Sequence, residues 1–156
     1  MARCLFNFTD GDREQAAALL DAKIWGIGDD ERHRAALAPG DLVLIYVATC
    51  REFIGRAELA TAIHEWTPSE AEVYPGDSPS GVTLTDVEKW DLAVPMDIVV
   101  QRIDPTASNP LVQANAARGF RMGVVVITDD EYEAVLALNR EARGTNSLQN
   151  CVTRSD

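Results

Sequence analysis

The sequence predicts an α+β domain in which five or six mostly antiparallel strands form a small curved sheet or barrel, flanked by helices. Three observations lead to this fold class. Apolar runs of strand length recur along the chain, hairpin-like connections join them, and helical patterns stand near the start, in the middle and at the end. The β-α-β alternation of a dinucleotide-binding fold is absent.

The first forty residues are expected to form a strand followed by two helices. Residues 3–8 are rich in aromatic and aliphatic side chains, which favours a strand. Thr9, Asp10 or Asp12 can cap the helix that follows. The buried face of that helix is expected to hold Ala16, Leu19, Leu20 and Ile24. The segment 25–28 breaks this helix, and a second short helix is expected over 31–38.

The next segment predicts a hairpin and then a long loop. Residues 42–48 are a continuous apolar run, typical of a strand buried on both faces. After four connecting residues a second strand alternates, with Arg56 and Glu58 on its polar face. The other face is expected to hold Ala57, Leu59, Thr61 and Ile63. Prolines and glycines over 65–85 predict a long loop with one short strand at most, and such loops are often functional.

The C-terminal half is expected to add strands and a closing helix. The segments 82–84 and 90–103 favour extended structure, with Pro95 confining the second to an edge or a bulge. A short helix around 110–118 and a strand over 120–127 follow. Thr128 and Glu131 form a capping box that opens the closing helix. Its buried side is expected to hold Tyr132, Val135 and Leu136. Gly144 is expected to end this helix, so that the domain spans 1–144 and a polar tail spans 145–156.

Charge and hydropathy limit the classes of partner. The chain has 25 acidic and 14 basic residues, a net charge of −11. A field this negative argues against a broad groove that tracks nucleic-acid phosphates. It leaves room for a small neutral ligand, or for one base held in a pocket with a few local arginines. No leader-like segment and no apolar stretch of about 20 residues is present, so we expect a cytoplasmic protein without a membrane partner.

Catalytic, metal-binding and cofactor-binding patterns are missing from the sequence. The three cysteines, Cys4, Cys50 and Cys151, are widely spaced without a C-x-x-C pair, and we expect them to be small buried hydrophobic residues. His33 and His64 belong to no metal-ligand pattern and are expected on the surface. No P-loop, nucleophile motif or Gly-rich dinucleotide fingerprint is present. We therefore assign no catalytic residue, metal or cofactor.

Aromatic residues stand at turn-rich places, where core aromatics are less usual. Trp25 and Tyr74 lie in turn-rich segments, and Trp66 and Trp90 stand at the two ends of the long loop. Such side chains can form a box that stacks on a flat ligand such as a nucleobase, although each one alone is more often a packing residue. Arg32, Arg34, Arg118 and Arg121 form a local basic spot or balance neighbouring acids.

The order of these segments resembles the EVE domain family, a branch of the PUA-like superfamily related to YTH domains. The matching motifs cover roughly residues 3–140. They are CLFNFT, IWGIG, RHRAALAPGDLVLIYVA, EFIGRAELATAI, YPGDSP and FRMGVVVITDDEYEAVL. The resemblance implies a small PUA-like β-barrel with a pocket for a base flipped out of DNA or RNA, often one that carries a methyl group.

The resemblance also implies roles for single residues. Trp25, with Gly26 beside it, matches the tryptophan of an aromatic cage. Asn7 and Thr9 match the region that hydrogen-bonds the base edge, and Tyr46 or Tyr74 would supply another wall. Arg32 and Arg34 would meet flanking phosphates, with Arg118 and Arg121 as further candidates for phosphate contacts. Many relatives are fused to nuclease or other effector modules, and none is expected here, so the chain would recognise but not cut.

Three hypotheses about function follow. The first is a non-enzymatic domain that binds a modified nucleobase in DNA or RNA, or a free nucleoside. The second is a protein-interaction module with a vestigial pocket, which would act through an effector protein. The third is an enzyme on a small nucleoside or RNA fragment, with His33 or Asp41 as acid or base. Product formation, ligand response and partner capture distinguish the three.

Overall fold

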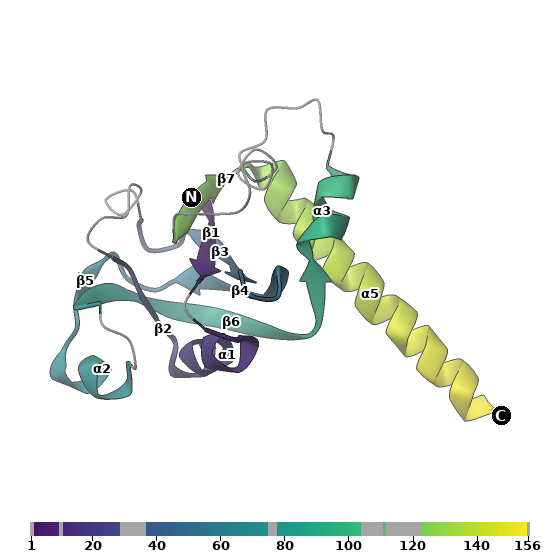
Figure 1. Cartoon of the computed structure of the whole chain (residues 1–156), viewed down its shortest axis with the longest axis horizontal. Coiled ribbons are helices and arrows are strands. Elements are labelled where there is room, and N and C mark those ends of the chain that lie inside the picture. Colours follow the sequence, from purple (N-terminus) through teal and green to yellow (C-terminus); the bar gives the residue numbers. More distant parts are fainter. Residues whose placement is uncertain are drawn as a thin grey trace.

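Seven strands form one strongly curved sheet, and helices pack on both of its faces (Figure 1). The computed structural model describes residues 2–9, 11–28, 37–74, 78–103, 111 and 123–155, with side chains up to residue 143. The elements in chain order are β1 (Arg3–Phe8), α1 (Arg13–Ala22), β2 (Ile24–Gly26), β3 (Leu42–Val47), β4 (Glu52–Leu59), β5 (His64–Glu65), α2 (Pro68–Val73), β6 (Ser80–Pro95), α3 (Met96–Arg102), β7 (Val124–Ile127) and α5 (Asp129–Ser155).

The strand order of the sheet is β2-β6-β4-β3-β1-β7, and the short β5 pairs with β6 outside this path. Strand β6 is 16 residues long and pairs with β2, β4 and β5. Its pairing with β4 shifts register twice, between Phe53 and Gly55 and between Arg56 and Glu58. Because each such irregularity bends the strands and increases their twist, the sheet curls into a half-barrel.

The predicted α+β class, curved sheet and mostly antiparallel pairing are confirmed, and the number of strands differs. The sheet has seven strands among the described residues, more than the five or six expected. One pair, β1 with β3, is parallel, whereas every other pair is antiparallel. Parallel neighbours need a crossover connection, and the chain between β1 and β3 supplies it with α1 and β2.

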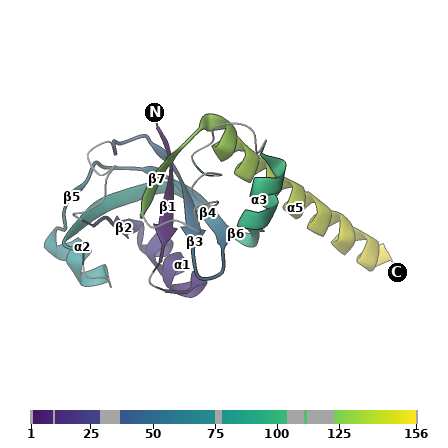
Figure 2. The same ribbon diagram turned by 45° about the horizontal axis from the view of Figure 1, so that its top comes forward.

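Two hydrophobic cores lie on opposite faces of the sheet because side chains alternate along each strand. The first core contains α1 and β2, and strand residues that include Phe6, Ile45 and Val82. The second core lies under α3 and α5 and includes Tyr46, Phe53 and Trp90. Helix α3 lies beside α5 in both ribbon views (Figure 2). Each face of the sheet is therefore covered by different helices.

Helix α1 follows its sequence signals closely. Asp12 is the N-cap, and its side-chain carboxylate accepts a hydrogen bond from the backbone N–H of Gln15. The backbone N–H of Asp12 donates in turn to the side-chain oxygen of Gln15, which completes a capping box. The predicted residues Ala16, Leu19 and Leu20 are buried. Ile24 is buried too, but it belongs to β2, because the helix ends at Ala22 and Lys23 takes a left-handed conformation.

The hairpin prediction is confirmed, and the predicted loop after it is wrong. Strands β3 and β4 pair antiparallel, and β3 is almost wholly buried. The segment 65–85 contains the end of β5, helix α2 and the start of β6. Thr67 and Glu70 form a capping box, and Pro68 stands at the first helical position, where its missing N–H costs nothing. These local signals favour a helix over a loop.

Two further expectations about the C-terminal half are wrong. Residues 96–102 form helix α3 and not a strand, because Pro95 fixes an extended backbone that serves as the N-cap. The closing helix does not end at Gly144, since α5 continues to Ser155. A single glycine lowers helix stability by only about 1 kcal/mol, which neighbouring good helix formers can offset. Of the helix expected over 31–38 only residues 37 and 38 are described, and they are not helical. Of the helix expected over 110–118 only Leu111 is described, and it is helical. Residues 120–122 of the expected strand lie outside the described residues.

The predicted capping box at the start of α5 is present, and its glutamate also binds a segment distant in the sequence. Thr128 Oγ1 accepts from the N–H of Glu131, and Glu131 Oε1 accepts from the N–H of Thr128. The second carboxylate oxygen of Glu131 accepts from the N–H of Leu111 at 2.8 Å, and Glu131 is fully buried. This carboxylate therefore ties the start of α5 to a distant segment. Tyr132 and Val135 are buried as expected, and Leu136 is partly buried.

The cysteine prediction holds for one residue and fails for another. Cys4 lies in the first core, where burial raises the pKa of its thiol to about 11. Cys50 is exposed in the turn between β3 and β4, so it is not a core residue. The side chain of Cys151 lies outside the described part. No helix among the described residues is both long enough and apolar enough to span a membrane.

Candidate functional site

Trp25, the residue most strongly marked by the sequence, lies inside the first core. It is 4% exposed in β2. Its indole stacks on Phe6 with ring centroids 5.9 Å apart and meets Phe8 edge-on, also at 5.9 Å. The left-handed Lys23 turns the chain from α1 directly into this strand. Trp25 is therefore a packing residue first, and any contact with a ligand is limited to the small part of its surface that remains open.

Two glycines face each other next to Trp25 and allow aromatic rings to lie on the strand backbone. Gly26 of β2 pairs with Gly81 of β6. A Cβ atom on Gly26 would overlap the hydroxyl of Tyr74, and one on Gly81 would overlap the Trp25 carbonyl and the ring of Trp66. Both positions therefore need glycine, since any side chain would displace an aromatic ring or the neighbouring strand.

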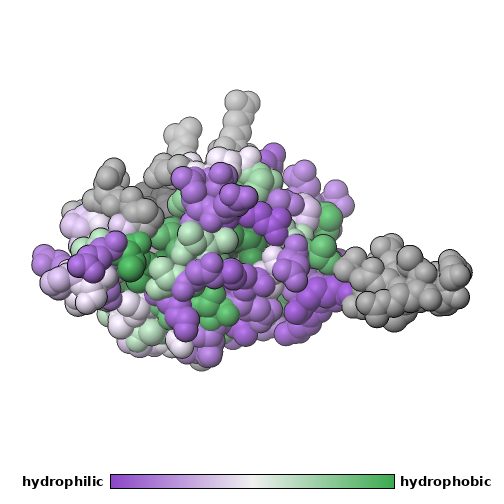
Figure 3. Space-filling view, turned by 90° about the horizontal axis from the view of Figure 1, so that it is seen from below, coloured by the Kyte–Doolittle hydropathy of each residue, from purple (hydrophilic) through white to green (hydrophobic). Residues whose placement is uncertain are grey.

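Trp66 and Tyr74 cover this glycine pair and remain partly exposed. Their ring centroids are 5.0 Å apart with a tilt of 47°, and the Trp66 ring meets His64 edge-on at 5.8 Å. The Trp66 indole N–H donates to the Ser78 carbonyl at 2.8 Å, which fixes the orientation of the ring. We call Trp66 and Tyr74 the aromatic cluster, and it packs against the first core, which contains Trp25. On the molecular face shown in Figure 3, hydrophobic residues form small separate patches among hydrophilic ones.

Helix α2 holds Tyr74 in place through the contact of its first turn with β5. His64 Nε2 lies 2.9 Å and 3.1 Å from the two carboxylate oxygens of Glu70. The Ala62 carbonyl and the Glu70 carboxylate raise the pKa of His64. The backbone N–H of Thr67, and then His64, lower the pKa of Glu70. Because Tyr74 is the C-cap of the same short helix, this pair fixes the position of one ring of the cluster.

The structure does not bring Asn7 and Tyr46 to the aromatic cluster. They are register partners in the parallel pair β1 and β3. Tyr46 lies in the second core, and Asn7 alternates with Phe6 and Phe8, whose rings contact Trp25. Both side chains therefore face the opposite side of the sheet from Trp25. Thr9 is exposed immediately after Phe8, at the end of β1.

The four arginines expected to contact phosphates cannot be placed. Arg32 and Arg34, like His33 between them, lie outside the described residues, and so do Arg118 and Arg121. Trp90 is described and belongs to the second core, where its indole N–H donates to Glu88 at 2.9 Å. Of the four aromatic residues singled out in the sequence, Trp66 and Tyr74 contact each other, whereas Trp25 packs on Phe6 and Phe8 and Trp90 lies in the second core.

Asp41, the carboxylate considered as a general acid or base, accepts hydrogen bonds from two backbone N–H groups. It is 4% exposed, and its two oxygens accept from the N–H groups of Ala2 and Ala38 at 2.9 Å and 3.0 Å. A carboxylate with both oxygens so engaged anchors the chain at the entry to β3. No group of three or more His, Cys, Asp or Glu side chains placed to hold a metal ion is found among the described residues.

Trp66, His64, Glu70 and Gly81 were not assigned to the site from the sequence, although signals for some of them existed. The capping box of Thr67 and Glu70 marks a helix that would carry Tyr74 back toward the sheet. Nothing local marks Gly81 as the partner of Gly26, because that pairing joins residues far apart in the chain.

Comparison with known proteins gives the fold. No protein-family model matches the sequence, and no curated protein matches it. A hypothetical protein from Leishmania major aligns over 92% of this chain and 97% of its own, with 18% identity and a TM-score of 0.66. Human THYN1, solved in complex with DNA containing 5-methylcytosine, aligns over 89% of this chain and 98% of its own, with 17% identity and a TM-score of 0.60.

The YTH domain of Mmi1, solved in complex with RNA, aligns over 93% of this chain and 82% of its own. Its identity is 16% and its TM-score 0.59. Identities this low carry information about architecture. The chain has the PUA-like fold of these structures, with the curved sheet and flanking helices described above.

Proposed function

We propose that this chain is a non-enzymatic domain that binds a nucleobase in DNA or RNA, carrying a modification such as a methyl group. The observation that supports this most is the aromatic cluster. Trp66 and Tyr74 lie in contact over the paired Gly26 and Gly81, remain partly exposed, and pack against the core that contains Trp25. Two neighbours with the same fold were solved with 5-methylcytosine DNA and with RNA.

In this proposal the base stacks on the partly exposed rings of Trp66 and Tyr74. Trp25, with Gly26 beside it, forms the inner wall, and Thr9 hydrogen-bonds the base edge. Stacking of one base on an aromatic side chain contributes about 1–3 kcal/mol. Extruding a base from a duplex costs a few kcal/mol, so single-stranded or already unpaired bases are the preferred targets.

Charge decides how the rest of the nucleic acid is held. The exposed Glu65 and Glu72 stand next to the cluster, so this edge does not attract phosphates at long range. We propose that Arg32 and Arg34, together with Arg118 and Arg121, supply the phosphate contacts. Their replacement by glutamine is expected to weaken binding of every oligonucleotide alike and to reduce its salt dependence.

Fluorescence anisotropy of labelled oligonucleotides tests the proposal. Each probe contains one 5-methylcytosine or one N6-methyladenine, and each has an unmodified twin. Loss of the Trp66 ring in Trp66→Leu is expected to weaken binding of the preferred probe about 5- to 150-fold, the equivalent of 1–3 kcal/mol. Ile98→Ser is the matched control, because Ile98 is 45% exposed on α3, in a different part of the fold.

The outcomes separate the three hypotheses. Saturable binding that Trp66→Leu weakens and Ile98→Ser leaves unchanged supports base recognition. A folded Trp66→Leu variant that binds as tightly as wild type contradicts it. No response to any probe, together with a stable protein partner in a pull-down, favours the interaction module. Conversion of a nucleoside or RNA fragment to product favours an enzyme.

A further inference from the structure

A second candidate site lies where α5 covers the sheet, away from β5 and α2, which carry the aromatic cluster (Figure 1). A pocket of about 260 Å³ opens between α5 and the strands β3, β4 and β6. Leu42, Arg56 and Glu88 line it from the sheet, and one face of α5 lines it from the helix. This volume lies just below the range of roughly 300–1,000 Å³ that is usual for small-molecule sites. The proposed base-binding function does not use this pocket.

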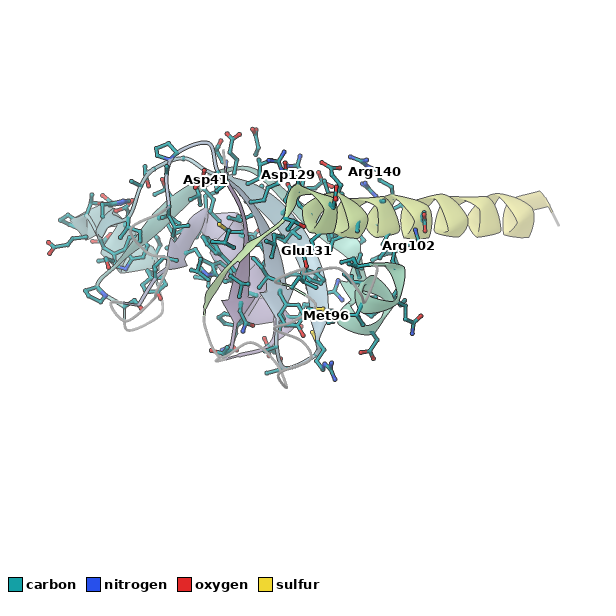
Figure 4. All side chains as sticks on the ribbon, turned by 90° about the horizontal axis from the view of Figure 1, so that it is seen from above. Asp41, Met96, Arg102, Asp129, Glu131 and Arg140 are labelled. Carbon is teal, nitrogen blue, oxygen red and sulfur yellow. The ribbon has the colours of Figure 1, made fainter. Side chains whose placement is uncertain are left out.

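Positive charge gathers here, although the chain as a whole is strongly acidic. Three arginines line the pocket against two glutamates, Glu88 and Glu133. Glu88 is already engaged, because it binds Arg56 Nε at 3.2 Å and lies 3.8 Å from Arg143 Nη1. Arg140 makes no ion pair with any residue that the structure describes. In Figure 4 its side chain extends from α5 on the side away from Arg102.

Two residues of the lining also carry buried oxygen atoms without a hydrogen-bond partner in the described part of the chain. Asn139 is 1% exposed, and its amide nitrogen donates to the Leu92 carbonyl at 3.0 Å, but its Oδ1 has no donor. The hydroxyl of Tyr132 has no partner of good geometry, although Arg56 is near enough to oppose the rise in its pKa that burial causes. Buried polar atoms of this kind are stabilised by a ligand that donates to them.

We propose that this pocket binds a small organic phosphate monoester whose body carries hydroxyl groups. Arg140 and Arg143 would hold the phosphate, because its charge of nearly two and its three terminal oxygens suit more than one guanidinium fork. The hydroxyl groups would donate to Asn139 Oδ1 and to the Glu133 carboxylate. The same chemistry is found in a free sugar phosphate and at the phosphorylated end of an oligonucleotide.

Isothermal titration calorimetry on the full chain tests this with five probes. They are ribose 5-phosphate, ribose, inorganic phosphate, and one short oligonucleotide with and without a 5′-phosphate. Ribose 5-phosphate is expected to bind saturably and more weakly as salt is raised, more tightly than inorganic phosphate, while ribose gives no signal. Binding of the 5′-phosphorylated oligonucleotide alone also supports the site and identifies the phosphorylated end of a nucleic acid as its ligand.

Paired arginine variants decide whether the pocket is responsible. Arg140→Gln is expected to weaken binding at least tenfold. Arg102→Gln is the matched control, since Arg102 is an exposed arginine of α3 that pairs with Glu141 of α5 and does not line the pocket. Equal losses in both variants would mean general charge attraction and would overturn the proposal, as would the absence of binding by every phosphorylated probe.

Discussion

Replacement of Trp25 by alanine is expected to destabilise the domain severely, whatever its role in binding. Trp25 is 4% exposed and contacts two phenylalanine rings, each at 5.9 Å. Loss of a buried tryptophan typically costs about 3–5 kcal/mol, including the cavity that remains. A domain of this size has a total stability of about 5–15 kcal/mol. Trp25→Ala therefore removes a large part of the free energy of unfolding.

Urea denaturation followed by far-ultraviolet circular dichroism measures this effect without relying on the tryptophan that was removed. The midpoint is expected to fall while the slope with urea stays constant. Trp66→Ala is the comparison, because Trp66 is only partly buried and its loss is expected to cost about half as much. A cost below about 1 kcal/mol for Trp25→Ala would refute the packing argument and would mean that the indole is a free pocket wall.

This result governs how ligand binding can be tested. A loss of binding in Trp25→Ala would not separate a lost contact from a damaged fold. Trp25→Phe keeps an aromatic ring against Phe6 and removes only part of the volume. If Trp25→Phe is folded and binds the preferred oligonucleotide more weakly, the base contacts Trp25 directly.

Three further outcomes are expected. Gly81→Ala should lower stability by about 2 kcal/mol or more in urea denaturation, because its methyl group would overlap the Trp25 carbonyl. The His64 and Glu70 pair should stabilise the fold fully below the ordinary histidine pKa of 6.5, and this stability should be lost as pH rises through the raised pKa of His64. The expected change in the free energy of unfolding is less than about 1 kcal/mol. Glu70→Gln should remove this change from the pH profile of unfolding. Asp41→Asn should cost about 1–3 kcal/mol in thermal or urea unfolding and leave oligonucleotide binding unchanged, because the amide places a donor against a backbone N–H.

Each of these has a contrary result. A Gly81→Ala variant as stable as wild type would mean that the β2 and β6 edge is looser than described. A pH profile that Glu70→Gln leaves unchanged would show that the Ala62 carbonyl alone holds the raised pKa of His64. Loss of all activity toward a nucleoside in a stable Asp41→Asn variant would favour the enzyme hypothesis.

Local signals allowed much of the fold to be predicted. The strand at 3–8, the helix capped by Asp12, the β3 and β4 hairpin, and the capping box of Thr128 and Glu131 depend on neighbours within a few residues. The spacing of hydrophobic residues and the capping residues depend only on such near neighbours, so they predict these elements directly. Helix α2 could have been predicted in the same way, since Thr67, Pro68 and Glu70 are a local signal that the proline and glycine content around them masked.

The sequence by itself determined the type of most strands and helices, the acidic character of the chain, and the unusual positions of Trp25, Trp66 and Tyr74. Only the tertiary structure decided which of these side chains meet. The parallel pairing of β1 with β3 turned Asn7 and Tyr46 to the side of the second core, and the pairing of Gly26 with Gly81 made room on the strands for the rings of Trp66 and Tyr74. A strand shows which residues share a face, but the choice of partner strand is set by the free energy of burying whole faces together, which no short segment encodes.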